Sequence, residues 1–147
     1  MLASLEFIQA AVARQRNKPF LKATMAASAL AMLADGEVQL AERYRLDEIL
    51  QRLEGLKIYD PQKAIAILDE FIHDLRSNDR EAREVLLGKL ARAGQDPESA
   101  RVIPSVVLAI CASDGVFSEG ERHVFEEICA ALGLNPADYE DPLKGSV

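Results

Sequence analysis

The chain has 147 residues, enough for one domain with a substantial hydrophobic core; 49% of them are hydrophobic and 28% are charged. The formal net charge is -7, and because an acidic protein repels phosphate backbones, nucleic acid is excluded as an expected partner. No stretch approaches the roughly 18 uninterrupted apolar residues of a membrane-spanning helix, and no basic segment precedes the first apolar residues, as a signal peptide requires. We therefore expect a folded cytoplasmic protein that does not insert into membranes.

Helix-forming residues dominate the first part of the chain, and no run of alternating β-branched residues predicts a strand. Apolar residues at helical spacing predict a helix over residues 2–16. Pro19 suits the first turn of a second helix, which is apolar on almost every face and ends near Gly36. A third helix is expected from about Leu40 to Leu53.

The rest of the chain also predicts helices, each with its own start signal. The signals of the fourth, fifth and sixth helices are Asp60-Pro61, Asn78 with Glu81, and Asp96-Pro97. Pro104 should kink or split the sixth helix, because proline has no backbone N–H to donate. Ser118 caps a seventh helix that runs to about Leu132, and residues 141–147 form a loose tail. We expect one compact all-α domain of about seven helices over residues 1–147.

The chain contains an internal repeat. Residues 33–50 read LADGEVQLAERYRLDEIL and residues 112–129 read ASDGVFSEGERHVFEEIC; a shift of 79 residues aligns Asp-Gly with Asp-Gly and Glu-Arg with Glu-Arg without a gap. An apolar helix precedes each turn and an amphipathic helix follows it. We therefore predict two helical hairpins, over about residues 19–76 and 97–140, related by an approximate two-fold axis. We call residues 35–42 the first elbow and residues 114–121 the second elbow.

Each elbow carries an aspartate and a glutamate, which are Asp35 with Glu42 and Asp114 with Glu121. An aspartate at the carboxyl end of a helix is disfavoured by the helix dipole, so its use in both elbows indicates a bound cation. The spacing Asp-Gly-x5-Glu matches the second half of a calcium-binding EF-hand loop, although the first ligand positions of that loop are apolar here. The two elbows together could pool four carboxylates.

The alternative interpretation of these acids is purely structural. Ser118 and Glu121 form a capping-box pattern, which explains Glu121 without a metal ion. The isolated Cys111 and Cys129 each lie among apolar neighbours and are expected to be buried thiols, with a disulfide or a metal role as the alternative. No nucleophile elbow, phosphate-binding loop or Cys/His pair is present, so we expect a protein that is not an enzyme.

AMLADGEVQLAERYRLDEIL and AICASDGVFSEGERHVFEEIC resemble the elbows of the bacterial tellurite-resistance TerB family, a fold also seen in membrane-anchored DjlA-type co-chaperones. The resemblance covers roughly residues 19–140. It implies a compact, pseudo-symmetric helical domain, a cytoplasmic stress-response role, and metal ligation by Asp35, Glu42, Asp114 and Glu121. The sequence has neither the His-Pro-Asp of a J-domain nor a membrane anchor, which weakens a direct co-chaperone role.

Three functions follow from this resemblance and from the residues themselves. The first is a non-enzymatic domain that binds a divalent cation, with calcium, magnesium, manganese and zinc all open, through the paired elbows. The second is an interaction or co-chaperone-like adaptor module without a metal, whose acidic faces dock a basic or membrane-associated protein. The third, a metal-dependent hydrolase, lacks a general base outside the elbows.

Overall fold

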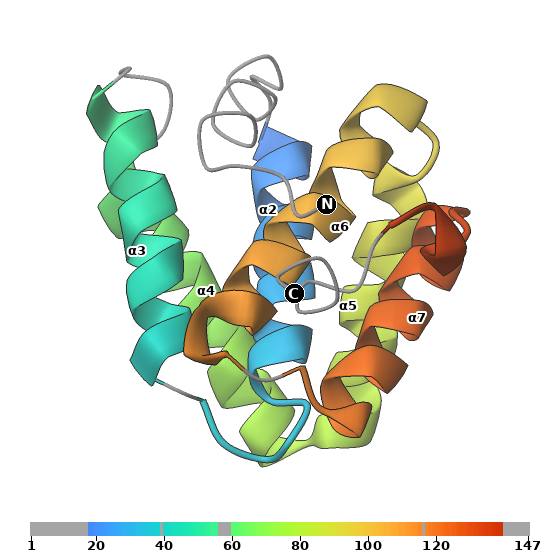
Figure 1. Cartoon of the computed structure of the whole chain (residues 1–147), viewed down its shortest axis with the longest axis horizontal. Helices are drawn as coiled ribbons and strands as arrows, with labels where there is room; N and C mark the ends of the chain where they lie inside the picture. Colours follow the sequence, from blue (N-terminus) through green and yellow to red (C-terminus); the bar gives the residue numbers. More distant parts are fainter. Residues whose placement is uncertain (1–17, 39, 56–59, 116, 140–147) are drawn as a thin grey trace.

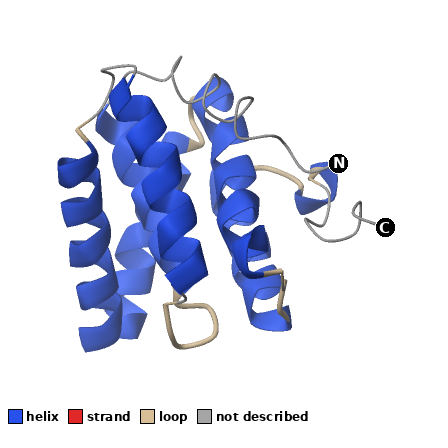
Figure 2. Cartoon of the chain, turned by 60° about the vertical axis from the view of Figure 1, so that its left-hand side comes forward, coloured by secondary structure: helices blue, strands red, loops and turns tan. Residues whose placement is uncertain are grey.

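The computed structural model describes residues 18–38, 40–55, 60–115 and 117–139, and within these ranges every regular element is helical (Figures 1 and 2). The α-helices are α2 (Lys18–Met32), α3 (Leu40–Gly55), α4 (Pro61–Ser77), α5 (Asp79–Ala93), α6 (Pro97–Cys111) and α7 (Glu119–Leu132). Two short 3-10 helices are η1 (Ala112–Asp114) and η2 (Pro136–Asp138). The all-α prediction is confirmed. The predicted helix over residues 2–16 and the predicted tail over 141–147 lie outside the described residues.

Helix α2 lies at the centre of the fold and packs against α4, α5, α6 and α7 (Figure 1). Its alanines are almost fully buried, which lets the neighbouring helices approach closely. Its two buried hydroxyl groups are satisfied within the helix: Thr24 donates to the carbonyl of Phe20 and Ser28 donates to that of Thr24, both at 2.8 Å. The prediction that this helix is buried on most faces is therefore confirmed.

The predicted helix starts are confirmed by the hydrogen bonds of their capping side chains. The Asp60 and Asp96 carboxylates accept from the backbone N–H groups two residues ahead, at 2.9 Å and 3.2 Å, and a proline follows each aspartate. At the start of α5, the Asn78 amide oxygen accepts from the N–H of Glu81, and its NH2 group donates to the Glu81 carboxylate at 3.0 Å. These local bonds fix where each helix begins.

Helix α6 is not split at Pro104. It remains one α-helix from Pro97 to Cys111, with Pro104 inside it. Ile103 and Val107 are buried on either side of the proline. Their packing against the core compensates for the one helical hydrogen bond that proline cannot donate. Of the two predicted outcomes, kinking or splitting, the structure excludes splitting.

Candidate metal centre

The two predicted elbows have the same backbone construction. α2 ends three residues before Asp35, and α6 continues through η1 to Asp114. In each case the following glycine adopts the left-handed conformation, with φ of 91° at Gly36 and 80° at Gly115. That conformation is open to glycine at little cost, and it reverses the chain toward α3 or α7. Both turns lie at the lower end of the molecule in Figure 1.

The elbows also touch each other, although they are far apart in the sequence. The Ser118 hydroxyl, 83 residues from Asp35, lies 2.8 Å from one Asp35 carboxylate oxygen and 3.0 Å from the other. Gly120 makes this approach feasible, since a Cβ atom there would lie 2.5 Å from an Asp35 carboxylate oxygen and 3.1 Å from the carbonyl oxygen of Ala34. Asp35 is exposed and lies at the N-terminus of α7, where the helix dipole favours a negative charge. The side chain therefore joins the first elbow to the second.

Behind this contact, the two repeat-related glutamates converge in the interior. Glu42, in the first turn of α3, is 2% exposed, and Glu121, in the first turn of α7, is 4% exposed. Cys111, the last residue of α6, is 0% exposed and lies beside them. One carboxylate oxygen from each glutamate and the Cys111 sulfur all lie within 4.8 Å of one another. Three helices thus each place one potential metal ligand at the same buried point.

The electrostatics of this cluster favour a positive charge. Two ionised carboxylates at such a separation repel each other by roughly 3–4 kcal/mol at the effective dielectric constant typical of proteins. Burial adds a desolvation penalty, because the protein interior solvates a charged carboxylate less well than water does. A capping box provides Glu121 with part of its hydrogen bonding: its carboxylate accepts from the Ser118 N–H at 3.0 Å, and its own N–H donates to the Ser118 hydroxyl at 3.0 Å. The capping interpretation and the cation interpretation of Glu121 are therefore compatible.

The structure brings together two of the four residues predicted as ligands. Glu42 and Glu121 meet, whereas Asp35 is hydrogen-bonded to Ser118 on the surface. The side chain of Asp114 is outside the described part of the structure. Ligation by the full set Asp35, Glu42, Asp114 and Glu121 stays a prediction.

Cys111 was predicted as a buried thiol and was not assigned as a ligand. The internal repeat contains a signal that could have singled it out. The shift of 79 residues places Cys111 opposite Met32, and both are the last residues of the helix that precedes an elbow. At the second elbow, the Cys111 side chain in that position lies close to Glu121, in the first turn of the following α-helix. Cys111 and Cys129 are both buried and neither forms a disulfide, and Cys129 lies in the last turn of α7 and does not belong to this cluster.

The described helices show no membrane-spanning candidate, since none of them is sufficiently long and apolar to cross a bilayer.

Comparison with known proteins identifies the family. The sequence model of the family described as "Tellurite resistance protein TerB" matches residues 21–142, which is most of the chain. Searches of curated proteins and of solved structures each gave no match. The family match confirms the resemblance carried by the two elbows, and the chain belongs to the TerB family.

Proposed function

We propose that this TerB-family domain is a non-enzymatic, cytoplasmic stress-response module of the tellurite-resistance type that binds a divalent cation between its two elbows. The observation that carries the proposal is the convergence of Glu42 and Glu121. They occupy equivalent positions in the two repeats, and both are almost completely buried within 4.8 Å of each other. A cation between them would offset their mutual repulsion and their loss of hydration.

A cation at this point would also join the two halves of the fold. Glu42 belongs to the α2–α3 hairpin and Glu121 to the α6–α7 hairpin. The bound ion would therefore connect the two hairpins a second time, in addition to the surface hydrogen bond between Ser118 and Asp35. Because the unfolded chain does not hold the two glutamates together, binding would stabilise the folded state by mass action.

The test is a titration of chelator-treated protein with calcium, magnesium, manganese and zinc, followed by calorimetry and thermal unfolding. At a free cation concentration of about 100 times Kd, the free energy of unfolding should rise by about 2.7 kcal/mol. For a domain of this size, that corresponds to an increase in Tm of roughly 10 °C. Absence of binding heat and of a melting shift with all four ions would contradict the proposal.

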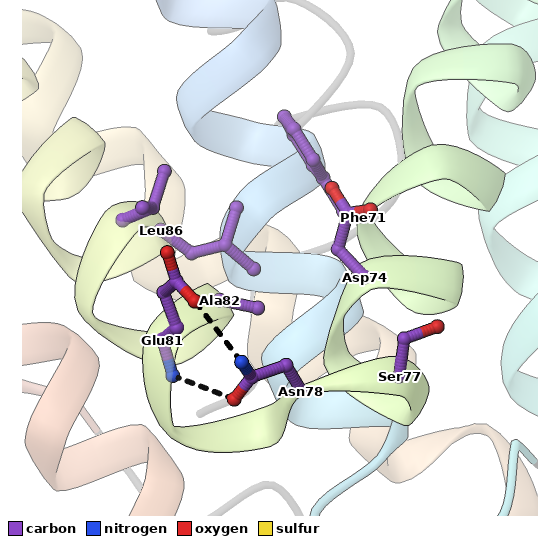
Figure 3. Close-up of a pocket in the computed structure, with 8 residues that line it drawn as sticks. Phe71, Asp74, Ser77, Asn78, Glu81, Ala82 and Leu86 are labelled. Carbon is purple, nitrogen blue, oxygen red and sulfur yellow. Dashed lines mark hydrogen bonds between the residues drawn. The ribbon is translucent and has the colours of Figure 1, made fainter.

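A surface pocket between α4 and α5 favours a second candidate function, the docking of a protein partner (Figure 3). The pocket has a volume of about 270 Å³. Its apolar lining includes Phe71, Ala82, Val85 and Leu86, and two acidic residues, Asp74 and Glu81, also line it. Val85 is 53% exposed. None of the described residues that line the pocket is basic, so its chemistry suits a basic amphipathic helix with an apolar side chain to insert.

This second function predicts binding of a synthetic helix-forming peptide of leucine and lysine. Addition of the peptide should shift the backbone NMR signals of residues 71–86, and Asp74→Lys should weaken its binding by roughly fivefold, because a like charge replaces an attractive one. Glu70→Lys is the matched control, since Glu70 is an exposed acid on the same helix that does not line the pocket. Equal weakening by both variants would mean that net charge alone attracts the peptide. Shifts elsewhere in the protein would exclude the pocket as its site.

A further inference from the structure

The candidate cation site contains the Cys111 sulfur in addition to the carboxylate oxygens of the two glutamates. We propose that the Cys111 sulfur is a metal ligand together with Glu42 and Glu121, so that the site selects a thiophilic divalent cation such as Zn²⁺ over Ca²⁺ and Mg²⁺. This inference rests on the proposed cation site and specifies which class of ion it takes. The sequence alone left calcium, magnesium, manganese and zinc open.

The geometry is suited to a small ion with few ligands. In a tetrahedral zinc site with Zn–S near 2.3 Å and Zn–O near 2.0 Å, sulfur and oxygen ligands lie roughly 3.5 Å apart. The three ligand atoms here lie within 4.8 Å of one another, so small side-chain rotations would bring them to that spacing. Their positions at the end of α6 and in the first turns of α3 and α7 are fixed by three packed helices.

The ligand set disfavours hard cations. Calcium takes six to eight oxygen ligands and magnesium retains several water molecules in an octahedral shell. The described residues of this cluster offer two carboxylates and one sulfur, each at most 4% exposed. A sulfur ligand contributes little to calcium or magnesium but binds zinc and cobalt well. A buried site with three ligands of this kind therefore favours a cation that accepts sulfur and a low coordination number.

Cys111 must be distinguished from a cysteine that merely fills space, as free buried cysteines commonly do. Cys129 provides the comparison within the same chain, because it is also 0% exposed and forms no disulfide. Burial, together with a smaller contribution from the charge of Glu126, raises the pKa of the Cys129 thiol to about 12. Cys129 does not belong to the cluster of potential ligands, and Cys129→Ala removes the same atoms from the core as Cys111→Ala.

The experiment uses Co²⁺ as a spectroscopic substitute for Zn²⁺. Chelator-treated full-length protein is titrated with Co²⁺, and the absorption is recorded for sulfur-to-cobalt charge transfer in the near ultraviolet and for the visible bands of tetrahedral cobalt. We expect both in the wild type and in Cys129→Ala, with displacement by Zn²⁺ but not by an excess of Ca²⁺. In Cys111→Ala the charge-transfer band should disappear and Zn²⁺ affinity should fall at least tenfold.

The outcomes distinguish the proposed cation site itself from the proposed role of Cys111 as one of its ligands. Cation binding that needs Glu42 but gives no charge-transfer band, even in the wild type, would overturn the role of Cys111 and leave the carboxylate site standing. Failure of every cation to bind would overturn both proposals. Since the charge-transfer band is recorded in the wild type, a folding defect of Cys111→Ala would not obscure the result.

Discussion

Replacing Glu42 with glutamine is expected to have opposite effects on stability with and without a bound cation. In chelator-treated protein, Glu42→Gln should leave the free energy of unfolding unchanged or raise it, because it removes one of two like charges buried within 4.8 Å of each other. In saturating cation, the wild type gains about 3–4 kcal/mol from binding at 100 to 1,000 times Kd. The variant, which lacks a carboxylate ligand, should lose that gain.

Glutamine is the informative substitution because it changes charge without changing shape. Glu121→Gln should show the same inversion, since a glutamine at this position can still accept the Ser118 N–H bond of the capping box. An alanine at either position would also leave a cavity, and cavity formation destabilises the protein whether or not a cation is present. The measurement is urea denaturation of the wild type and both variants, with and without cation.

The controls are elbow acids that face solvent. Glu37 and Glu119 lie in the first and second elbows and are exposed, so their glutamine variants should retain the full stabilisation by cation. If Glu42→Gln destabilised the protein equally with chelator and with cation, the two glutamates would form a structural polar cluster. The proposed function would then be wrong.

Local patterns in the sequence accounted for the helices because capping is a short-range effect. Asp60, Asn78, Asp96 and Ser118 cap helices through bonds that span two or three residues, and such bonds can be read from the sequence directly. Pro104 shows the limit of this approach. Its effect on α6 depended on burial by residues from other helices, which no local pattern reports.

The candidate site was only partly predictable for the same reason. The repeat predicted that the two elbows would approach each other, and the structure places Ser118 against Asp35 and Glu121 near Glu42. The repeat did not indicate that the aspartates and glutamates have different surroundings: Asp35 is exposed, and Glu42 is buried. The proximity of Cys111 to both glutamates depends on how α6 packs against α3 and α7, which is a tertiary property.

Gly94→Ala is expected to lower the free energy of unfolding by about 1–3 kcal/mol, because a methyl group there has no space. Gly94 follows α5 with φ of -63° and ψ of -15°, which any residue can adopt, so its backbone conformation does not require glycine. The constraint is contact with the last residue of α7. A Cβ atom would lie 2.6 Å from the Leu132 carbonyl oxygen and 3.0 Å from its carbonyl carbon. These are backbone atoms, which cannot rotate away as a side chain can.

Gly88→Ala is the matched control, and its effect should have the opposite sign. Gly88 lies inside α5, the helix that Gly94 follows. Apart from its chain neighbours and the nearby backbone of α5, no heavy atom lies within 4 Å of a Cβ atom placed at Gly88. Alanine should therefore stabilise the helix by about 0.5–1 kcal/mol. Urea denaturation of both variants measures the two effects, and destabilisation of similar size in both would refute the steric explanation.

The same pair of variants separates the stability of the fold from the integrity of the candidate site. Glu121 and Leu132 lie at opposite ends of α7, about 16 Å apart along its axis. The strain introduced by Gly94→Ala arises at the Leu132 end, so a variant that still folds should bind the cation with the affinity of the wild type. A large loss of affinity in Gly94→Ala would show that α7 shifts as a rigid body. In that case the position of Glu121 would depend on packing at both ends of the helix.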